Sequence, residues 1–230
     1  METLIKSWQY TFYFWPITCF ITIVFIILFF LPGKRSKNLP LTIKLYVTAY
    51  SITFILIDLS VLIRNKYDYF TDSLRNYGDY FFSITEFILV AYFFYSHNKS
   101  HKQKQVIVYV TVLFLIIAII LAFHLPDVLV VIRLYTTQTF LLLIPVFFYF
   151  MNLFKTTFIN DISNTPSFWI SAGIAFFLLC TITLSIIETF FLNHKPLILA
   201  KLYPIYYISY ILMFFMFLRA YLCKPNTVNS

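Results

Sequence analysis

Long runs of apolar residues, separated by short polar breaks, make up most of the chain. About 20 residues at helical rise are needed to cross the roughly 30 Å of hydrocarbon in a bilayer. The runs predict seven transmembrane helices, and the alternation typical of membrane strands is absent. The predicted helices cover residues 10–32, 41–63, 80–96, 106–124, 127–152, 167–192 and 197–223. We therefore expect an all-α polytopic membrane protein, in which residues 1–230 form a single transmembrane domain and one bundle of seven transmembrane helices.

The composition agrees with this pattern and excludes other classes of protein. Hydrophobic residues make up 61% of the chain, aromatic residues 22% and charged residues only 11%, which excludes a water-soluble domain. The net charge of +8 would suggest nucleic-acid binding in a soluble protein, but here Lys and Arg occupy short loops that flank the apolar runs. The three cysteines give neither a disulfide framework nor a zinc spacing. We expect the lipid bilayer as a partner, and no nucleic acid, metal or cofactor.

The basic residues predict the orientation, because short cytoplasmic loops carry an excess of Lys and Arg. With the N-terminus outside, ten basic residues lie on the inner side and six on the outer side. The inner residues are Lys34, Arg35, Lys37, Lys44, Lys99, Lys102, Lys104, Lys155, Arg219 and Lys224. The outer residues are Lys6, Arg64, Lys66, Arg75, Lys195 and Lys201. We expect a multi-pass protein of the plasma (inner) membrane, with its N-terminus outside and its C-terminus in the cytoplasm.

Ionisable residues inside the predicted spans gather towards one membrane face, which the orientation makes the outer face. They are Asp58, Glu86, His124, Arg133, Glu188 and Lys201. Glu86 lies about two turns inside the predicted helix 80–96. An acidic residue at the centre of a bilayer costs roughly 2.5–3.5 kcal/mol, so such residues usually face a bundle interior and find a partner. The carboxylate therefore marks a candidate functional site.

Helical spacing places the charged residues on mildly polar stripes, since residues three, four and seven apart share a face. The stripes are Ser51 and Asp58; Asp79, Ser83, Glu86 and Val90; Arg133, Thr136 and Thr137; and Thr181, Ser185 and Glu188. Lipid offers no hydrogen bonds, so such stripes suit charges that point at one another or at a polar cavity. We predict Glu86 and Arg133 as the central pair, with Asp58 and Glu188 as competing partners.

A tyrosine stripe on the last predicted helix could form an aromatic wall of the same pocket. Its members are Tyr203, Tyr206, Tyr207 and Tyr210. The alternative for this stripe is packing and an interfacial aromatic belt. The predicted ligand-binding residues are Glu86, Arg133, Asp58, Glu188, Tyr203, Tyr207 and Thr137. A structural alternative stays open here too, because an internal ion pair can set helix register and side chains near helix ends can reach water.

The motifs argue against an enzyme. There is no H-E-x-x-H and no G-x-S-x-G, and the four histidines occur singly or in a loop, so no catalytic residue is predicted. A transporter with three helices on either side of a central one is an alternative, because Asp58 and Glu188 fall at similar depths in the two halves. Pro16 and Pro145 do not match between those halves, which weakens that alternative.

Two short motifs carry a resemblance. Thr85-Glu86-Phe87, and Pro166-Ser167-Phe168-Trp169-Ile170 at the start of a predicted helix, resemble patterns in small uncharacterised seven-helix membrane proteins of bacteria. Those in turn resemble seven-helix sensing modules that act with histidine kinases. The resemblance implies a sensor whose output passes to a separate signalling protein at the cytoplasmic face, since no kinase domain follows the last predicted helix.

We therefore expect a sensor or receptor module with an outward-facing polar pocket. A small molecule from the outer side would favour one packing of the last three helices, with Pro145 and Pro204 as bend points. The alternatives are the three-one-three transporter and a membrane-embedded accessory or interaction subunit.

Overall fold

The computed structural model of the chain is all-α in the part that it describes. That part comprises residues 20, 23–27, 29–30, 38–63, 68–125, 127–156, 162, 164–191 and 196–223. The backbone alone is described at residues 54–63, 68–75, 128, 156, 188–191, 196–201 and 203. Residues 23–27 and 29–30 are helical and fall in the first predicted helix, 10–32, most of which lies outside the described residues.

Six long helices follow, close to the positions that the apolar runs predict. They are α2 (Leu41–Ile63), α3 (Asp68–His97), α4 (His101–Ala122), α5 (Val128–Thr156), α7 (Pro166–Phe191) and α8 (Pro196–Leu222). Asp127 accepts a hydrogen bond of 2.9 Å from the Leu129 amide and so caps the first turn of α5. Pro145 and Pro204 lie inside α5 and α8.

Helix α3 differs most from its prediction. The apolar run predicts a start at residue 80, but the helix begins at Asp68 and continues to His97. Its first third is rich in charged residues, so a search for apolar runs assigns it to a loop. The same charged residues are compatible with a helix that extends beyond the hydrocarbon. Glu86 therefore lies well inside the helix, eleven residues before His97. At 1.5 Å per residue this is about 16 Å, roughly half the thickness of the hydrocarbon core.

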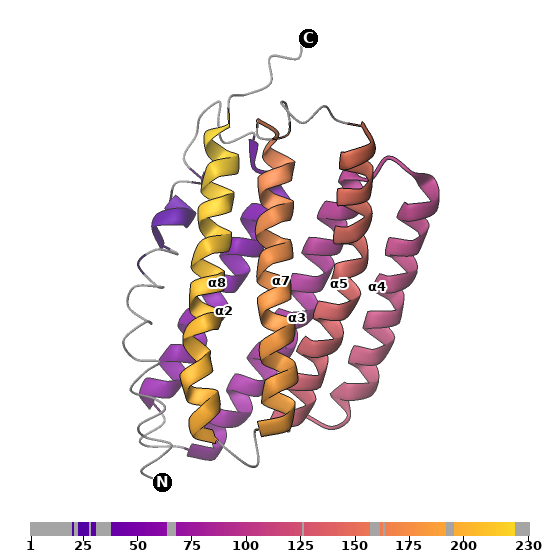
Figure 1. Cartoon of the computed structure of the whole chain (residues 1–230). Helices are drawn as coiled ribbons and strands as arrows, with labels where there is room; N and C mark the ends of the chain where they lie inside the picture. The colour runs from indigo at the N-terminus through magenta and orange to yellow at the C-terminus, as the bar shows by residue number, and fades with distance from the viewer. Residues whose placement is uncertain are drawn as a thin grey trace.

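The helices run alternately up and down in one bundle (Figure 1). Helix α7 packs against α8 on one side and α5 on the other, while α3 packs against α2, α4 and α5. Figure 1 shows α7 and α8 side by side in front of α2 and α3, with α4 at the margin of the bundle. Helix α3 therefore occupies a central position, from which its side chains can reach several neighbours.

The buried face of each helix follows the helical repeat. Among the described side chains of α2, the buried apolar ones are Ile43, Tyr46, Val47 and Tyr50. Helix α4 buries only a narrow stripe, formed by Ile107, Val110, Phe114 and Ala118. The rest of α4 exposes large apolar side chains such as Ile116 and Ile119, which suits contact with lipid.

Gly173 allows a close approach between α7 and α8. A Cβ atom at this position would lie 3.2 Å from the Met213 carbonyl oxygen and 3.2 Å from the Met216 Cβ. Small residues at helix interfaces let backbones approach closely in membranes, where apolar burial gives no drive for helices to associate. The two helices therefore pack through backbone proximity as well as side-chain contact.

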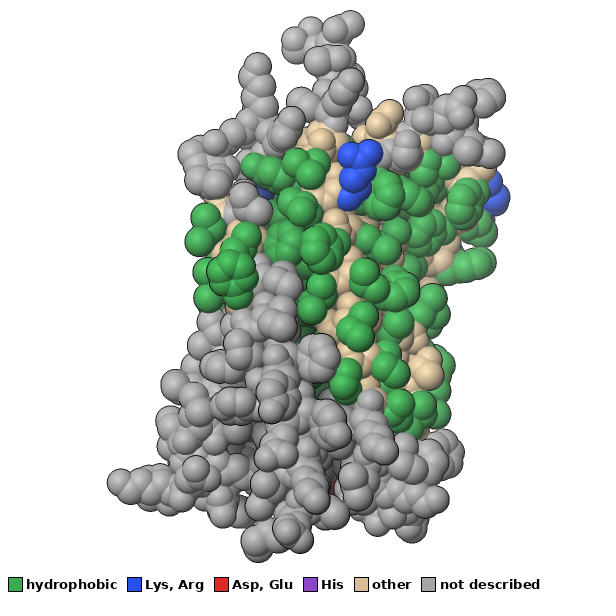
Figure 2. Space-filling model, turned by 60° about the vertical axis from the view of Figure 1, so that its left-hand side comes forward, with side chains coloured by type: hydrophobic (Ala, Val, Ile, Leu, Met, Phe, Trp, Pro, Cys, Tyr) green, Lys and Arg blue, Asp and Glu red, His purple; other side chains and the backbone are tan. Residues whose placement is uncertain are grey.

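Four helical segments among the described residues are long and apolar enough to cross a membrane. They are His101–Ala122, Leu129–Lys155, Pro166–Ile187 and Pro204–Leu222. Figure 2 shows an almost wholly apolar surface over the described part of one face, with basic side chains near its upper end. These lengths and this composition are those of a multi-pass membrane protein.

Candidate functional site

Glu86 lies in the interior of the bundle, with only 4% of its surface exposed. The Tyr46 hydroxyl on α2 donates a hydrogen bond of 3.0 Å to one carboxyl oxygen, Oε1. The Gln138 side-chain amide on α5 donates a hydrogen bond of 2.6 Å to the other oxygen, Oε2. Both oxygens of the carboxyl group thus accept hydrogen bonds, each from a different neighbouring helix.

Gln138 links this carboxyl group to a second side chain of α3. Its Oε1 atom accepts a hydrogen bond from the Ser83 hydroxyl, one turn before Glu86. All three residues are at most 4% exposed. A buried amide whose donor and acceptor both have partners is held in one orientation, so Gln138 fixes the donor that Glu86 meets. We call Tyr46, Ser83, Glu86 and Gln138 the carboxyl cluster.

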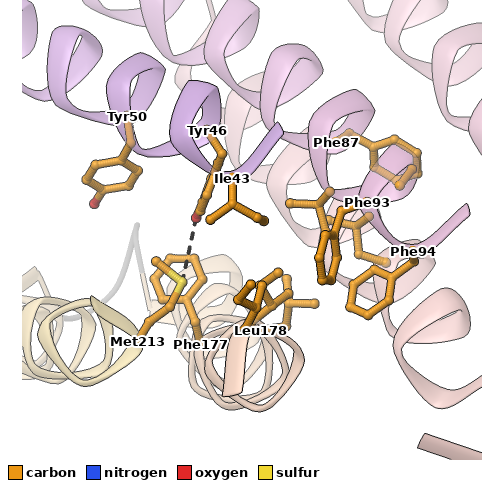
Figure 3. Close-up of a cluster of buried hydrophobic side chains, with 14 of the residues drawn as sticks. Ile43, Tyr46, Tyr50, Phe87, Phe93, Phe94, Phe177, Leu178 and Met213 are labelled. Atoms are coloured by element: carbon orange, nitrogen blue, oxygen red, sulfur yellow. Dashed lines mark hydrogen bonds between the residues drawn. The ribbon is translucent and has the colours of Figure 1, made fainter. Parts of the chain in front are cut away.

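The tyrosines of α2 connect the carboxyl cluster to α8. The Tyr46 hydroxyl lies 3.8 Å from the Met213 sulfur in a second hydrogen-bond contact (Figure 3). One turn further along α2, the Tyr50 hydroxyl forms a 3.0 Å hydrogen bond with the Tyr206 hydroxyl. The Tyr50 ring also stacks on the Tyr210 ring, with centroids 3.9 Å apart. Helix α8 therefore meets α2 through polar and aromatic contacts.

Arg133 does not join Glu86. Its side chain is exposed on α5, whereas Gln138 on the same helix faces the carboxyl group. Among the described residues no ion pair includes Glu86, and its hydrogen-bond donors are both uncharged. The expected central pair is thus replaced by a carboxyl group with two neutral donors. The reason is angular, since five residues along a helix turn a side chain by about 140°.

Apart from Ser83, several hydroxyl groups of the predicted polar stripes bond within their own helices. Thr137 donates to the Arg133 carbonyl oxygen at 2.8 Å, and Ser51 donates to the Val47 carbonyl oxygen at 2.6 Å. Thr181 does the same with Phe177 at 2.7 Å. Ser and Thr side chains in helices often bond to the carbonyl four residues earlier. A stripe of hydroxyls therefore does not by itself require a polar cavity.

The other predicted site residues have different outcomes. Tyr207 is 8% exposed and packs edge to face against Tyr206, with centroids 5.9 Å apart, so this part of the tyrosine stripe faces inwards. His124 is exposed in the turn after α4. The side chains of Asp58, Glu188, Tyr203 and Lys201 lie outside the described residues, although the structure places these positions in α2, α7 and α8.

Tyr46 and Gln138 are the functional candidates that the sequence prediction missed. Gln138 is a neutral amide in the middle of a long apolar helix, and such residues commonly form hydrogen bonds between membrane helices. Tyr46 lies five residues after the start of the predicted helix 41–63 and carries no formal charge, so a search for charged residues does not select it. A search for neutral polar residues, as well as charged ones, would have found Gln138.

A second polar group lies near the opposite end of α5. The Asn152 side-chain amide donates to Asn98 Oδ1 at 2.6 Å and to Gln103 Oε1 at 2.5 Å. Asn98 follows the end of α3, and Gln103 lies in the first turn of α4. We call these three residues the amide cluster. It joins the connection between α3 and α4 to the last turns of α5.

The described side chains contain no group of three or more His, Cys, Asp or Glu residues that could hold a metal ion. Comparison with protein-family models, with curated proteins and with solved structures found no match to the chain.

Proposed function

We propose that the chain is a seven-span sensor or receptor module of the plasma membrane, with its N-terminus outside and its C-terminus in the cytoplasm. In this proposal a small molecule enters a polar pocket from the outer side, and a separate signalling protein receives the output at the cytoplasmic face. In this proposal no residue of the chain has a catalytic role. The observation that supports the proposal is the carboxyl cluster, in which an acidic group buried in the bundle interior forms hydrogen bonds to two other helices.

The connectivity of the cluster favours a role in controlling helix packing. Glu86 on α3 bonds to α2 and α5, and Tyr46 on α2 also contacts Met213 on α8. Any ligand that competes for one of these hydrogen bonds changes the contacts between helices. Coupling between ligand binding and helix packing needs contacts that differ between two packings. The Tyr46 hydroxyl, which is shared between Glu86 and Met213, can make such different contacts.

The tyrosine contacts favour access from the predicted outer side. From Tyr46 to Tyr50, α2 advances towards the end at which α8 begins, and Tyr206 lies nearer that end of α8 than Met213. The Tyr50–Tyr206 hydrogen bond is therefore the next polar contact outward from Glu86. Asp58 and Tyr203 lie further along the same two helices. A ligand pocket at the outer side would be lined by these positions and by Tyr207.

The distribution of charge at the other end favours a cytoplasmic assignment. The described basic residues there include Lys44, Lys104, Lys155 and Arg219. Arg219 lies over the Trp169 ring, 5.7 Å from its centroid, and Lys104 lies over the Tyr95 ring at 5.1 Å. Basic and aromatic residues at one end of a bundle are typical of the cytoplasmic interface.

The test is a thermal-stability screen of small molecules on the purified protein in lipid nanodiscs. A true ligand at 100 times its Kd stabilises the folded state by about 2.7 kcal/mol. We expect that Tyr206→Phe removes most of this stabilisation, because it deletes the hydroxyl that meets Tyr50. Tyr109→Phe makes the same change on the exposed face of α4 and should keep the response. Equal loss or equal retention in both variants would contradict a pocket at this position.

The output step needs a separate measurement. A photo-crosslinking residue at Lys99, which is exposed between α3 and α4, should capture a cytoplasmic signalling protein from intact cells. In the wild type we expect the yield of the crosslinked product to change when the ligand is added. In Tyr206→Phe, adding the ligand should leave the yield unchanged. A product whose yield is indifferent to the ligand would argue for an accessory subunit.

The accessory or interaction subunit is the second candidate, and α4 favours it. This helix buries only four residues, so most of its apolar surface is open to another transmembrane helix. Co-purification of one membrane protein that is lost in a variant with Ile116 and Ile120 changed to smaller residues would support it. The same loss after changes at Phe147 on the exposed face of α5 would show that the effect is not specific to α4.

A further inference from the structure

The Tyr46 hydroxyl has one hydrogen but two acceptors. It lies 3.0 Å from Glu86 Oε1 on α3 and 3.8 Å from the Met213 sulfur on α8. A hydroxyl donates to one acceptor at a time, and its hydrogen rotates to suit its surroundings. A carboxylate attracts that hydrogen much more strongly than a thioether sulfur does, because hydrogen bonds to ionised groups are the stronger ones. The choice between the two acceptors therefore depends on the charge of Glu86.

We infer that Glu86 is a proton-binding site and that its protonation moves the Tyr46 hydrogen bond from Glu86 to Met213. In the ionised form, Tyr46 and Gln138 both donate to the carboxylate. When a proton adds to Oε1, the carboxylic acid becomes a donor to the Tyr46 oxygen, and the Tyr46 hydrogen turns to the sulfur. The proton comes from a hydronium ion in the water at the outer side, which loses one O–H bond and becomes water as the carboxyl O–H bond forms. This inference rests on the proposed function, because it names the proton as a ligand of the same site.

Two opposing influences act on the charge state of Glu86. Burial in the bundle interior opposes the ionised form, while two hydrogen bonds from neutral donors stabilise it. No cationic side chain in the described part of the chain forms an ion pair with Glu86 to hold it ionised. A carboxyl group with such opposing influences can gain or lose a proton in response to modest changes.

The described groups that face Glu86 from the neighbouring helices are uncharged, and Asp79, seven residues earlier, is the other acidic side chain described on α3. Helix α2 presents Tyr46 and Tyr50, and α5 presents Gln138. Helix α8 presents Tyr206 and Tyr210 beside Met213. On α4 the buried Phe114 stacks on Phe87 of α3, the residue after Glu86, with centroids 4.0 Å apart. Among the described side chains of α7, the buried polar ones are Ser171, Thr181 and Ser185, which do not titrate. Glu86 is thus the group expected to titrate here.

The switch would transmit protonation to α8. In the ionised state Tyr46 ties α2 to α3, and in the protonated state it ties α2 to α8 as well. Met213 lies where α8 approaches Gly173 of α7, since the Met213 carbonyl oxygen is one of the atoms nearest that glycine. A change in the bond from Tyr46 to Met213 therefore acts on the close α7–α8 interface.

The experiment is infrared spectroscopy of the full chain in nanodiscs, titrated between about pH 4 and about pH 9, where buried glutamates ionise. The wild type should show a carboxylic-acid carbonyl band that disappears as the pH rises. Glu86→Gln should remove that band. Tyr46→Phe should raise the midpoint by about 1–2 pH units, because the ionised form loses a donor. Met213→Leu should lower the midpoint, because the protonated form loses the second acceptor for Tyr46. This shift should be smaller than the one in Tyr46→Phe.

Tyr109→Phe is the matched control, and its midpoint should equal that of the wild type. If Glu86→Gln does not fold, the band can be assigned in a protein that keeps Glu86, because the chain has only three glutamates. A protein with labelled glutamate carboxyl groups and with Glu2→Gln and Glu188→Gln leaves Glu86 as the one labelled group. Absence of a titrating labelled band, or a midpoint that ignores both Tyr46→Phe and Met213→Leu, overturns the inference.

The result can be separated from the proposed function. A band that titrates as expected, with no ligand-dependent crosslinking at the cytoplasmic face, would leave the proton site intact and reject the sensor. A ligand response that persists when no band titrates would reject the proton site alone.

Discussion

Two polar clusters hold this bundle together, and they differ in one chemical respect. The amide cluster joins the α3–α4 connection to the end of α5 with three uncharged side chains. The carboxyl cluster joins α2, α3 and α5 in the middle of the bundle, and its centre is an acidic group. The amide cluster, which lies near an end of the bundle where water is closer, shows that neutral side chains are sufficient to link helices.

The difference teaches that a carboxyl group is more than packing requires. An uncharged residue at Glu86 could accept one hydrogen bond and avoid the cost of burying a charge, roughly 2.5–3.5 kcal/mol in translocon scales. Ionisable residues at such depth commonly serve in ion or proton pathways. The contrast with the amide cluster is thus the reason to place function, and not structure alone, at the carboxyl cluster.

The largest expected effect is that of Glu86→Leu. This change removes the acceptor of the buried Gln138 amide and leaves the Tyr46 hydroxyl only the weaker Met213 sulfur, so it should destabilise the bundle by about 2–4 kcal/mol. The measurement is the free energy of unfolding in mixed micelles with increasing denaturing detergent. A cost below that of Asn152→Leu would remove the distinction between the two clusters.

Asn152→Leu should have the next largest effect, about 1–2 kcal/mol, by the same measurement. It removes the donor to Asn98 and Gln103, but water near the membrane surface can replace part of what is lost. The change should also leave the infrared titration of the carboxyl band where it is in the wild type. A displaced midpoint would show that the two clusters are coupled through α5.

A double-mutant cycle between Tyr46→Phe and Glu86→Gln should show a smaller, specific coupling of about 1 kcal/mol. The two side chains share a direct hydrogen bond, so the cost of the double change should be less than the sum of the single costs. Unfolding in mixed micelles again supplies the free energies. A cycle of Tyr46→Phe with Asn152→Leu is the control, and there the two costs should simply add.

The sequence predicted the helical fold well because membrane helices leave a strong signal. The predicted range 41–63 coincides with α2, and four of the other helices start within five residues of their predicted positions. Helix α3 failed at its start because Asp68, Asp72 and Arg75 ended the apolar run without ending the helix. Hydrophobicity reports where lipid begins, whereas helix termini depend on capping and on the next connection.

The site was predicted only at its centre. Glu86 stood out because a single acidic residue interrupts a long apolar run, and it does lie in the interior of the bundle. Its partners could not be found in the same way, because partner choice depends on the rotation of each helix about its own axis. Tyr46 and Gln138 carry no formal charge, so a search for charge complementarity selected Arg133 instead.

The smallest expected effect concerns Arg133 and tests that correction directly. Arg133→Met on the exposed face of α5 should change the free energy of unfolding by no more than about 0.5 kcal/mol, the usual range for surface substitutions. Combined with Glu86→Gln, it should add within about 0.5 kcal/mol, because the two side chains share no contact. An ion pair would instead make the double variant more stable than the sum of the single costs allows. Recovery of stability in the double variant would mean that Glu86 and Arg133 meet in the membrane, and that the neutral donors on α2 and α5 are not what holds the carboxyl group.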